Sequence, residues 1–238
     1  MGIIIFNGEI SSDYNIVVEH PPNYEYAERD YEVMHVPGRN GDVIINKGSY
    51  KNVPQPYDIA FYRRNNNFTD LASGVSQWLH APSGYARLED SYSPEYYRMA
   101  YYMEDGEFKN LLQVAGRATI TFNCKPQRYL KSGELPHHIV SNSSILNQTT
   151  NNSEPKIIVH GSGKGILNIG GSTIEITEIV NGMIIDSSKQ DTYYENRNLN
   201  SKVIMHNYLY PTLVPGNNVI QISGGITSVE VIPRWWTL

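Results

Sequence analysis

The chain has 238 residues and a formal net charge of −5, with 40 % apolar and 18 % charged residues. This length fits one large β domain or two smaller ones, and the composition is that of a globular protein rather than a disordered one. No run of basic residues occurs in the sequence, which argues against a nucleic-acid-binding role.

The cysteine content and the N-terminus narrow the class of protein further. Cys124 is the only cysteine, so neither an intrachain disulfide nor a cysteine-based zinc site is predicted. The N-terminus lacks the features of a signal peptide, and no segment approaches the roughly 18 apolar residues of a membrane span. We therefore expect a protein made in a reducing cytoplasm, with no membrane partner, no metal and no cofactor.

Strand patterns cover most of the first half of the chain. The predicted strands are residues 3–6, 16–18, 31–36, 43–45, 57–62, 86–89, 96–103 and 117–124. The last of these has the cleanest alternation, because Ala118, Ile120, Phe122 and Cys124 share one face while Arg117 and three polar residues share the other. One buried and one wet face predicts an antiparallel sheet.

Residues 70–80 carry the one convincing helix pattern. Four apolar residues recur at i, i+4, i+7 and i+8: Leu71, Val75, Trp78 and Leu79. Thr69 or Asp70 is the expected N-cap, and Pro82 should end the helix. We expect the apolar stripe to pack on a sheet.

Residues 132–154 differ in composition, because Ser, Asn, Thr, Gly and Pro dominate there. We interpret them as the junction between an N-terminal domain, 1–131, and a C-terminal domain, 132–238. Six short strands follow: 156–160, 165–169, 173–176, 183–186, 219–222 and 228–232. Their turns suggest a β-sandwich of jelly-roll type. The Gly-rich segment 161–165 lacks the spacing of a phosphate loop and predicts a hairpin turn.

Residues that could carry catalysis are few. Neighbouring His137 and His138 point to opposite faces of a strand, so they do not easily chelate one metal. A glycosidase needs two carboxylates across a cleft, and the sequence alone does not exclude such a pair. The candidates are Glu89, Asp90, Glu104, Asp105, Asp186 and Asp191. Each lies where a strand ends, so we predict no catalytic residue and no enzymatic activity, with a hydrolase on a β-scaffold as the least favoured alternative.

Trp235 and Trp236 directly continue the strand pattern of residues 228–232. One of the two should face the core while the other flanks it, which favours core or interface packing. Exposed tryptophan also stacks on sugar rings, so a carbohydrate-binding adhesin module is the alternative function.

Several stretches together resemble the distal tail protein (Dit) family of siphophages in order and approximate spacing. In the first half they are Asn7-Gly8, Pro-Gly-Arg-Asn-Gly at 37–41, the helix ending in Trp78-Leu79, Leu88-Glu89-Asp90, the Tyr-rich strand at 96–102 and Phe-Asn-Cys-Lys-Pro at 122–126. In the second half they are residues 155–159, 161–163, 185–187, 210–213 and 215–218, and the terminal Pro233-Arg234-Trp235. Pro-Gly-Arg-Asn-Gly is the most specific of these stretches.

The resemblance implies an N-terminal β-sandwich-like domain with one α-helix, related in fold to tail tube proteins, and a C-terminal galectin-like β-sandwich. It implies a homohexameric ring, formed through the N-terminal domain, that joins the tail tube protein to the tip or baseplate. A tail-associated fibre or lysin protein, or a baseplate protein, would attach there. The implied location is the virion tail tip, after synthesis in the bacterial host cytoplasm.

We expect ring contacts at one loop and the strands beside it. The loop residues are Pro37, Gly38, Arg39, Asn40 and Gly41. The competing explanation for them is a tight turn alone. Some members of the family carry long C-terminal insertions that hold receptor-binding proteins or bind sugars. Residues 155–238 already form a minimal sandwich without such an insertion.

Overall fold

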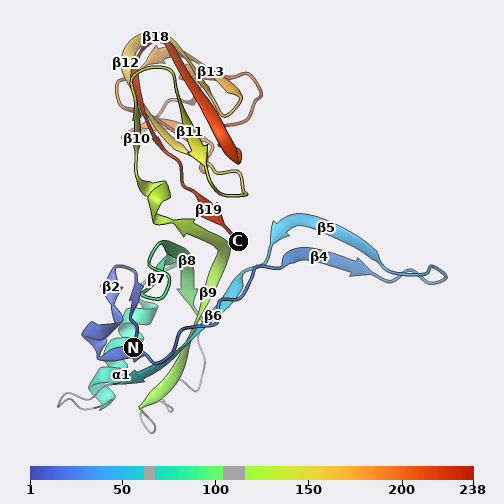
Figure 1. The fold of residues 1–238 in the computed structure, drawn as a ribbon, viewed down its shortest axis with the longest axis vertical. Coiled ribbons are helices and arrows are strands. Elements are labelled where there is room, and N and C mark those ends of the chain that lie inside the picture. Colours follow the sequence, from blue (N-terminus) through green and yellow to red (C-terminus); the bar gives the residue numbers. More distant parts are fainter. Residues whose placement is uncertain (62–67, 104–115) are drawn as a thin grey trace. The chain divides into compact units, whose positions relative to one another are not determined.

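The computed structural model describes residues 1–61, 68–103 and 116–238, and it is mainly β with one α-helix in this described part of the chain (Figure 1). This agrees with the predicted fold class. The chain divides into two compact units: the first unit is Met1–Arg128 with Leu238, and the second unit is Tyr129–Thr237. No helix among the described residues is long and apolar enough to cross a membrane.

The first unit is built on one curled antiparallel sheet. Its strands are β1 (Ile4–Phe6), β2 (Glu9–Ile10), β3 (Ile16–Val18), β6 (Val53–Phe61), β7 (Ala86–Asp90), β8 (Tyr96–Tyr102) and β9 (Arg117–Leu130), in the order β2-β1-β7-β8-β9-β6-β3. The chain just before β1 meets β3, because the Gly2 amide donates to the Val18 carbonyl at 2.9 Å and the Val18 amide donates back at 2.8 Å. The sheet is therefore a half-barrel with a concave, apolar inner face.

The helix α1 (Phe68–His80) packs its predicted stripe into this core, where Val75, Trp78 and Leu79 are buried. The Trp78 indole donates to the Phe6 carbonyl at 3.1 Å and stacks on Tyr14 of the 3-10 helix η1 (Ser11–Tyr14), with ring centroids 5.0 Å apart. The predicted N-cap is wrong, because the helix begins at Phe68 and both candidate residues lie inside it. The residue before Phe68 lies outside the described residues.

Strand β9 confirms the predicted register. Ile120, Phe122 and Cys124 are fully buried, Thr119 is exposed and Thr121 is half-buried. Strand β6, which pairs with β9 throughout, begins at Val53, before the predicted start of that strand. The early part contains Pro54 and Pro56. Proline has no backbone N–H, so it cannot donate a hydrogen bond to a neighbouring strand. It is accommodated because β3 pairs only with residues 59–61 of β6, which leaves one side of the proline segment without a strand.

We expect Phe122→Ala to cost about 3–5 kcal/mol of the free energy of unfolding, because it would leave a cavity in the first core. The Phe122 ring packs against Phe6, 4.8 Å between centroids, and against Tyr57 at 6.0 Å. Thr121→Ala, one position along the strand, is the control and should stay within about 1 kcal/mol. Chemical denaturation measures both, and equal small losses would contradict the register.

A separate two-stranded sheet belongs to the first unit. Its strands are β4 (Arg29–Met34) and β5 (Val43–Tyr50), which pair with each other and with no other strand in the described part of the chain. In Figure 1 this hairpin extends away from the curled sheet of its own unit. Residues 19–28 lead from β3 into β4, and the short stretch after β5 leads directly into β6.

The second unit is all β apart from two 3-10 turns, η2 (Lys131–Glu134) and η3 (Asn200–Lys202). Its strands are β10 (His137–Ile139), β11 (Ser143–Asn147), β12 (Lys156–Ile169), β13 (Ser172–Ile179), β14 (Met183–Asp186), β15 (Asp191–Tyr194), β16 (Arg197–Asn198), β17 (Val203–Met205), β18 (Gly216–Ile232) and β19 (Trp236–Thr237). The long strands β12 and β18 pair with each other along most of their lengths. The first part of β12 also pairs with β14 and its last part with β13, so the two long strands take part in both layers.

The prediction of a hairpin turn at residues 161–165 is wrong. Strand β12 runs through this segment without reversing, and β18 likewise joins two predicted strands into one. Glycines make the passage between layers, because a Cβ on Gly225 would lie 1.7 Å from the Ser162 carbonyl oxygen and one on Gly161 would lie 2.1 Å from the Gly225 carbonyl oxygen. Only bare backbone fits where the two strands cross the bend.

Residues 132–154, interpreted above as a junction, form η2, β10 and β11 inside the second unit. Both strands pair with β18. Ile139 and Ile145 are buried in its core, while the Ser and Asn residues around them are mostly exposed. The polar composition of this segment thus belongs to the outer face of edge strands rather than to a linker.

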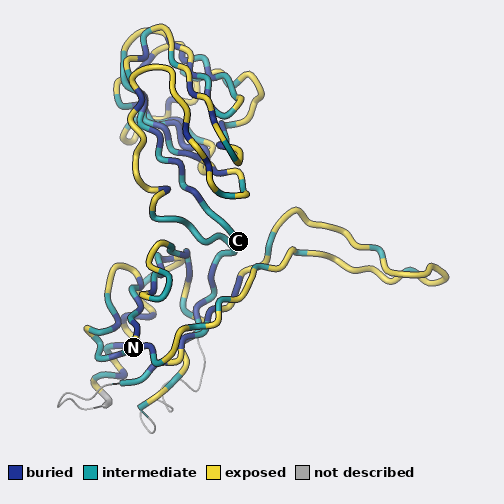
Figure 2. Tube along the Cα trace, viewed as in Figure 1, coloured by how far each residue is buried: buried dark blue, intermediate teal, exposed yellow. Residues whose placement is uncertain are grey.

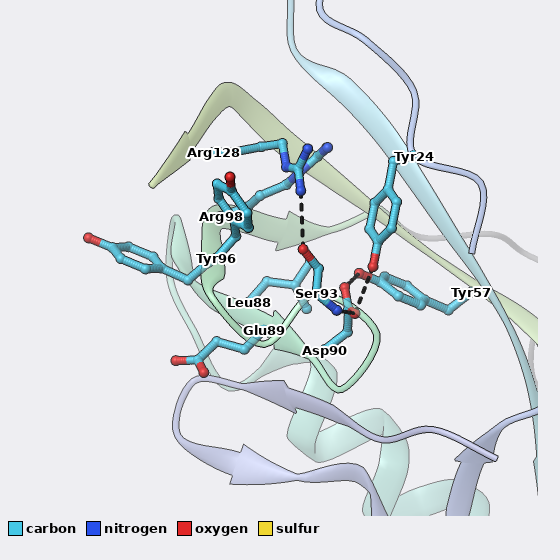
Figure 3. Close-up of a pocket in the computed structure, with 10 residues that line it drawn as sticks. Tyr24, Tyr57, Leu88, Glu89, Asp90, Ser93, Tyr96, Arg98 and Arg128 are labelled. Atoms are coloured by element: carbon cyan, nitrogen blue, oxygen red, sulfur yellow. Dashed lines mark hydrogen bonds between the residues drawn. The ribbon is translucent and has the colours of Figure 1, made fainter. Parts of the chain in front are cut away.

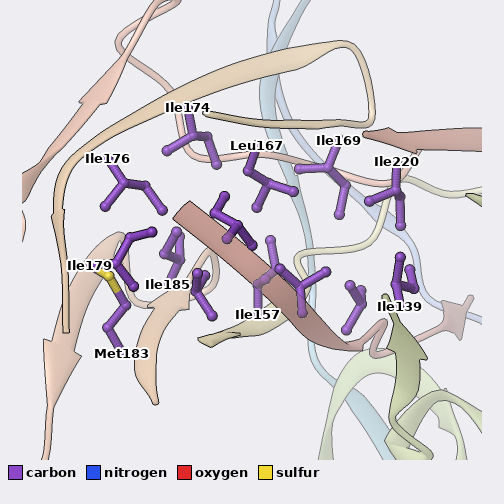
Figure 4. Packing of buried hydrophobic residues seen from close by; sticks show 14 of the residues in the cluster. Ile139, Ile157, Leu167, Ile169, Ile174, Ile176, Ile179, Met183, Ile185 and Ile220 are labelled. Atoms are coloured by element: carbon purple, nitrogen blue, oxygen red, sulfur yellow. The ribbon is translucent and has the colours of Figure 1, made fainter. Parts of the chain in front are cut away.

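One apolar cluster fills the second unit (Figure 4). It takes Ile157 and Leu167 from the two parts of β12, together with Ile174 from β13 and Ile185 from β14. Since both layers contribute side chains to the same cluster, the unit is a sandwich whose layers share β12 and β18.

Candidate assembly interface

The hairpin formed by β4 and β5 is the most exposed regular element of the first unit, and residues 29–50 are called the arm below (Figure 2). Its exposed side chains include five large apolar ones: Tyr31, Val33, Met34, Ile44 and Ile45. The most open are Val33 and Ile44, at 61 % and 64 %. Such side chains normally cover a core, and the arm pairs with no other strand among the described residues, so it has the composition of a contact surface.

The register of the arm places apolar side chains on both of its faces. Val33 lies directly opposite Ile44, and Tyr31 shares their face. Met34 and Ile45 lie on the other face. A lone two-stranded hairpin is marginally stable in water, and both of its strands are edges with unpaired backbone groups. A partner that covers the arm would therefore stabilise it.

The five loop residues expected to contact a neighbour form the tip of the arm. Pro37, Gly38, Arg39, Asn40 and Gly41 are all exposed. Gly38 and Gly41 have φ of 81° and 80°, the left-handed conformation that glycine adopts without strain. The loop is therefore both a tight turn and an exposed tip, so the turn conformation does not argue against a contact there.

The base of the arm is fastened to the curled sheet through residues 19–28. The Gln55 side-chain amide donates to the Asn23 carbonyl at 3.0 Å, and the Tyr24 hydroxyl donates to Asp90 Oδ1 at 2.8 Å (Figure 3). Tyr24 is half-buried and Asp90 is buried at the end of β7. These two bonds hold the irregular segment that leads into the arm.

Asp90 is a structural carboxylate with its acceptor positions filled. Besides Tyr24 it accepts from the Tyr57 hydroxyl at 3.0 Å and from the amides of Tyr92 and Ser93, each at 2.9 Å. Burial, followed by the hydrogen bond to Asp90, raises the pKa of Tyr24 above its ordinary range. Burial likewise raises the pKa of Tyr57, so both phenols stay protonated and donate.

The two candidate carboxylates of the second unit, Asp186 and Asp191, also accept hydrogen bonds from neighbouring side chains. Asp186 accepts from Arg234 at 2.6 and 3.0 Å and from the Ser188 hydroxyl at 2.9 Å, and Asp191 accepts from Asn198 at 2.9 Å. Burial would raise the pKa of Asp186, but the hydrogen bonds from Arg234 and Ser188 outweigh it and leave that pKa below its usual value.

In the first unit, Glu89 forms an ion pair with Arg87. Glu104 and Asp105 lie outside the described residues. Within residues 1–61, 68–103 and 116–238, no three His, Cys, Asp or Glu side chains gather in a way that could hold a metal ion.

The two terminal tryptophans lie in different environments. Trp235 is 7 % exposed and belongs to the core of the second unit. Trp236 is half-buried, and its indole donates to the Asn152 carbonyl at 2.9 Å. The Trp235 ring therefore has no open face for a sugar, and Trp236 alone is partly accessible.

A groove of about 400 Å³ lies beside the bend of β12, between residues of β12, β13 and β18. Ile166, Lys164 and Glu175 are among the residues that line it. Glu175 is within 2.7 Å of His206, and the Thr177 hydroxyl donates to the Lys202 carbonyl at 3.1 Å. Its volume suits a small ligand, but no aromatic ring contributes to its lining in the described part of the chain.

Sequence reasoning found the tip of the arm but missed its length and its anchor. Residues 31–36 and 43–45 were recognisable as strands. Whether the hairpin joins the curled sheet depends on the tertiary fold, which the sequence of the hairpin does not reveal. Tyr24 and Asp90 are 66 positions apart. The one signal that pointed to exposure is the mixture of apolar side chains on both faces of β4 and β5.

The fold of the chain, a curled sheet with a protruding hairpin followed by a β-sandwich, matches a solved structure over its full length. The chain is similar to the crystal structure of the SPP1 Dit protein, described as a paradigm of the hub adsorption apparatus in phages that infect Gram-positive bacteria. The TM-score is 0.74, the identity is 13 %, and the match covers 100 % of both chains.

At this identity the similarity establishes the fold, and it confirms the predicted resemblance at that level. A scan against protein-family models finds no match. A search of curated proteins finds no match either.

Proposed function

We propose that this chain is a structural, non-enzymatic protein of a phage tail tip. Six copies form a ring that connects the tail tube to the tip or baseplate and to the host-recognition apparatus. The observation that carries the proposal is the arm, which exposes apolar side chains on both faces, in a chain whose fold matches SPP1 Dit over its whole length.

A closed ring needs a head-to-tail interface, in which one surface of each copy meets a different surface of the next. The arm fits the projecting half of such an interface, with Pro37–Gly41 at its tip and Val33 and Ile44 along its side. Permanent interfaces of this kind bury more than roughly 2,000 Å². A two-stranded arm covered on both faces contributes a large part of that area.

The proposed partners are further copies of the chain, the tail tube protein, and a tail-associated fibre, lysin or baseplate protein. The proposed location is the virion tail tip. The hydrogen bonds around Asp90 and Asp186 support a structural role for these carboxylates, because both oxygens of each already accept from neighbouring side chains.

The second candidate function is a carbohydrate-binding adhesin module, and the groove beside β12 is the observation that favours it. The burial of Trp235 and the lack of aromatic rings around the described groove weaken it, because sugar sites commonly stack a ring on an aromatic face. Glycan binding by the full chain that is lost on Lys164→Ala would support this function.

Electron microscopy of the concentrated protein, and of tail tips labelled on it, tests the ring. We expect rings of six subunits with a central hole, and only weak association in dilute solution. A chain that stays monomeric or dimeric at every concentration and never labels the tail tip would end the proposal. Rings of another order would keep the assembly and correct the subunit number.

A further inference from the structure

Two arginines lie beside the Asp90 cluster at one end of the curled sheet. Arg98 of β8 and Arg128 of β9 line a cavity of about 10 Å³ under residues 19–28 (Figure 3). The guanidinium carbon of Arg128 is 5.3 Å from the centre of the Tyr24 ring and 4.4 Å from that of Tyr96. The guanidinium carbon of Arg98 is 6.0 Å from the Tyr24 ring centre.

Arg98 points inward and is only 7 % exposed. Its Nη1 atom is buried and has no hydrogen-bond partner among the described residues. The guanidinium lies near Cys124, whose thiol pKa is raised by burial to about 11 although Arg98 lowers it. A neutral thiol does not balance a buried positive charge, so the guanidinium keeps an unfilled donor in an apolar setting.

Among the residues that the structure describes, Arg128 has one polar partner, the Ser93 hydroxyl, to which its Nη2 donates at 3.1 Å. Neither arginine forms an ion pair within the described part of the chain. The nearest carboxylates are committed elsewhere, since Asp90 holds four donors and Glu89 pairs with Arg87. The cavity is thus lined by two arginines and by two carboxylates, Glu89 and Asp90, that already accept from donors other than these arginines.

We infer that this cavity is a binding site for a small oxyanion with the geometry of a carboxylate. One oxygen of the anion occupies the cavity, which has room for one water-sized atom, and accepts from Arg98 Nη1. The second oxygen accepts from Arg128 at the rim. Arginine donates to carboxylates in this paired manner, and the bonds are stronger than those to a neutral water.

The same chemistry can come from two sources: a free carboxylate ion, or an Asp or Glu side chain of another copy of the chain. The site does not depend on the proposed ring, because Arg98 Nη1 has no hydrogen-bond partner among the described residues of the single chain. The experiment is therefore designed to detect the anion first and to separate the sources afterwards.

The test is a titration of the full chain with sodium formate at constant ionic strength, followed by NMR of the ¹⁵N-labelled arginine side chains. The Arg98 signals should shift and saturate. Arg128→Gln should raise the formate Kd about tenfold, the loss of one charge-assisted hydrogen bond. Arg39→Gln, at the exposed tip of the arm, is the matched control and should leave the Kd unchanged.

Sedimentation of the chain with and without formate separates the sources. If an acidic side chain of a second copy fills the site, both formate and Arg128→Gln lower self-association. If the ligand is a free ion, formate binds while self-association stays the same. Arg98 signals that do not respond to formate would show that the cavity holds only water. An equal response in the Arg128→Gln protein would show that Arg128 does not take part in binding, and either result would overturn the inference.

Discussion

The double substitution Val33→Asp with Ile44→Asp is expected to abolish ring assembly and to leave the thermal unfolding of the chain unchanged. The two side chains face each other across β4 and β5 and are mostly exposed, so the new carboxylates are solvated in the free chain. In an interface each substitution loses about 1.5–3 kcal/mol of apolar burial and adds an unpaired charge. Each contact should weaken at least about a hundredfold.

The measurements are sedimentation velocity and electron microscopy of the concentrated protein. Val140→Asp with Val219→Asp is the matched control, because these second-unit side chains are 65 % and 54 % exposed and lie outside the arm. The control should assemble like the unchanged chain. If the arm variant forms rings with normal yield, the arm is not the interface, although a ring built from other surfaces would stand.

Arg234→Met should destabilise the second unit by about 3–5 kcal/mol at neutral pH, since it leaves a buried carboxylate without its charged partner. Asp186 is 1 % exposed, and Arg234 is its only ion-pair partner in the described chain. Arg234 also donates to the Ser188 hydroxyl at 2.6 Å. It does so from the left-handed conformation, φ 56°, which the network must hold against local strain.

The depressed pKa of Asp186 sets the pH dependence of this loss. A carboxylate with a lowered folded-state pKa contributes stability above its unfolded pKa, near 3.9, and loses that contribution as the pH falls through the folded value. The difference between the unchanged chain and Arg234→Met should therefore be large at pH 7 and shrink in acid. Denaturant titrations at both pH values measure it.

Arg197→Met is the control for the loss of one positive charge, because Arg197 is exposed and lies in the same unit. It should change the free energy of unfolding by less than about 0.5 kcal/mol. A loss for Arg234→Met that is as large in acid as at neutral pH would contradict the role assigned to Asp186.

The strands that follow a local rule could be predicted from sequence. The alternation around Phe122 fixed which side chains of β9 face the core, and the helical spacing of Val75, Trp78 and Leu79 fixed the buried face of α1. Both are properties of consecutive residues. Pro54 and Pro56 hid the start of β6, because their compatibility with a strand depends on which neighbour is missing.

The bent strands could not be predicted for a similar reason. Glycines at 161–165 are equally compatible with a turn and with a strand that crosses from one layer to the other, and only the close approach of Gly225 decides between them. The polar residues at 132–154 likewise match a linker until β18 is present to pair with them.

The candidate interface was predictable only at its tip. Turn chemistry is local, so residues 37–41 could be recognised as an exposed loop. The anchor of the arm joins Tyr24 to a carboxylate 66 positions away. Arg98 is notable because its Nη1 atom has no acceptor among the described residues. Neither relation leaves a pattern in neighbouring residues.

The sharing of β12 and β18 by both layers determines how the second unit comes apart. In an ordinary sandwich each strand belongs to one layer, so one layer can unfold while the other stays folded. Here, withdrawing β18 removes a pairing partner from β10, β11 and β12, and withdrawing β12 removes one from β13, β14 and β18. Opening in one layer therefore propagates to the other, and the unit melts in a single cooperative step with no half-unfolded state to expose its core.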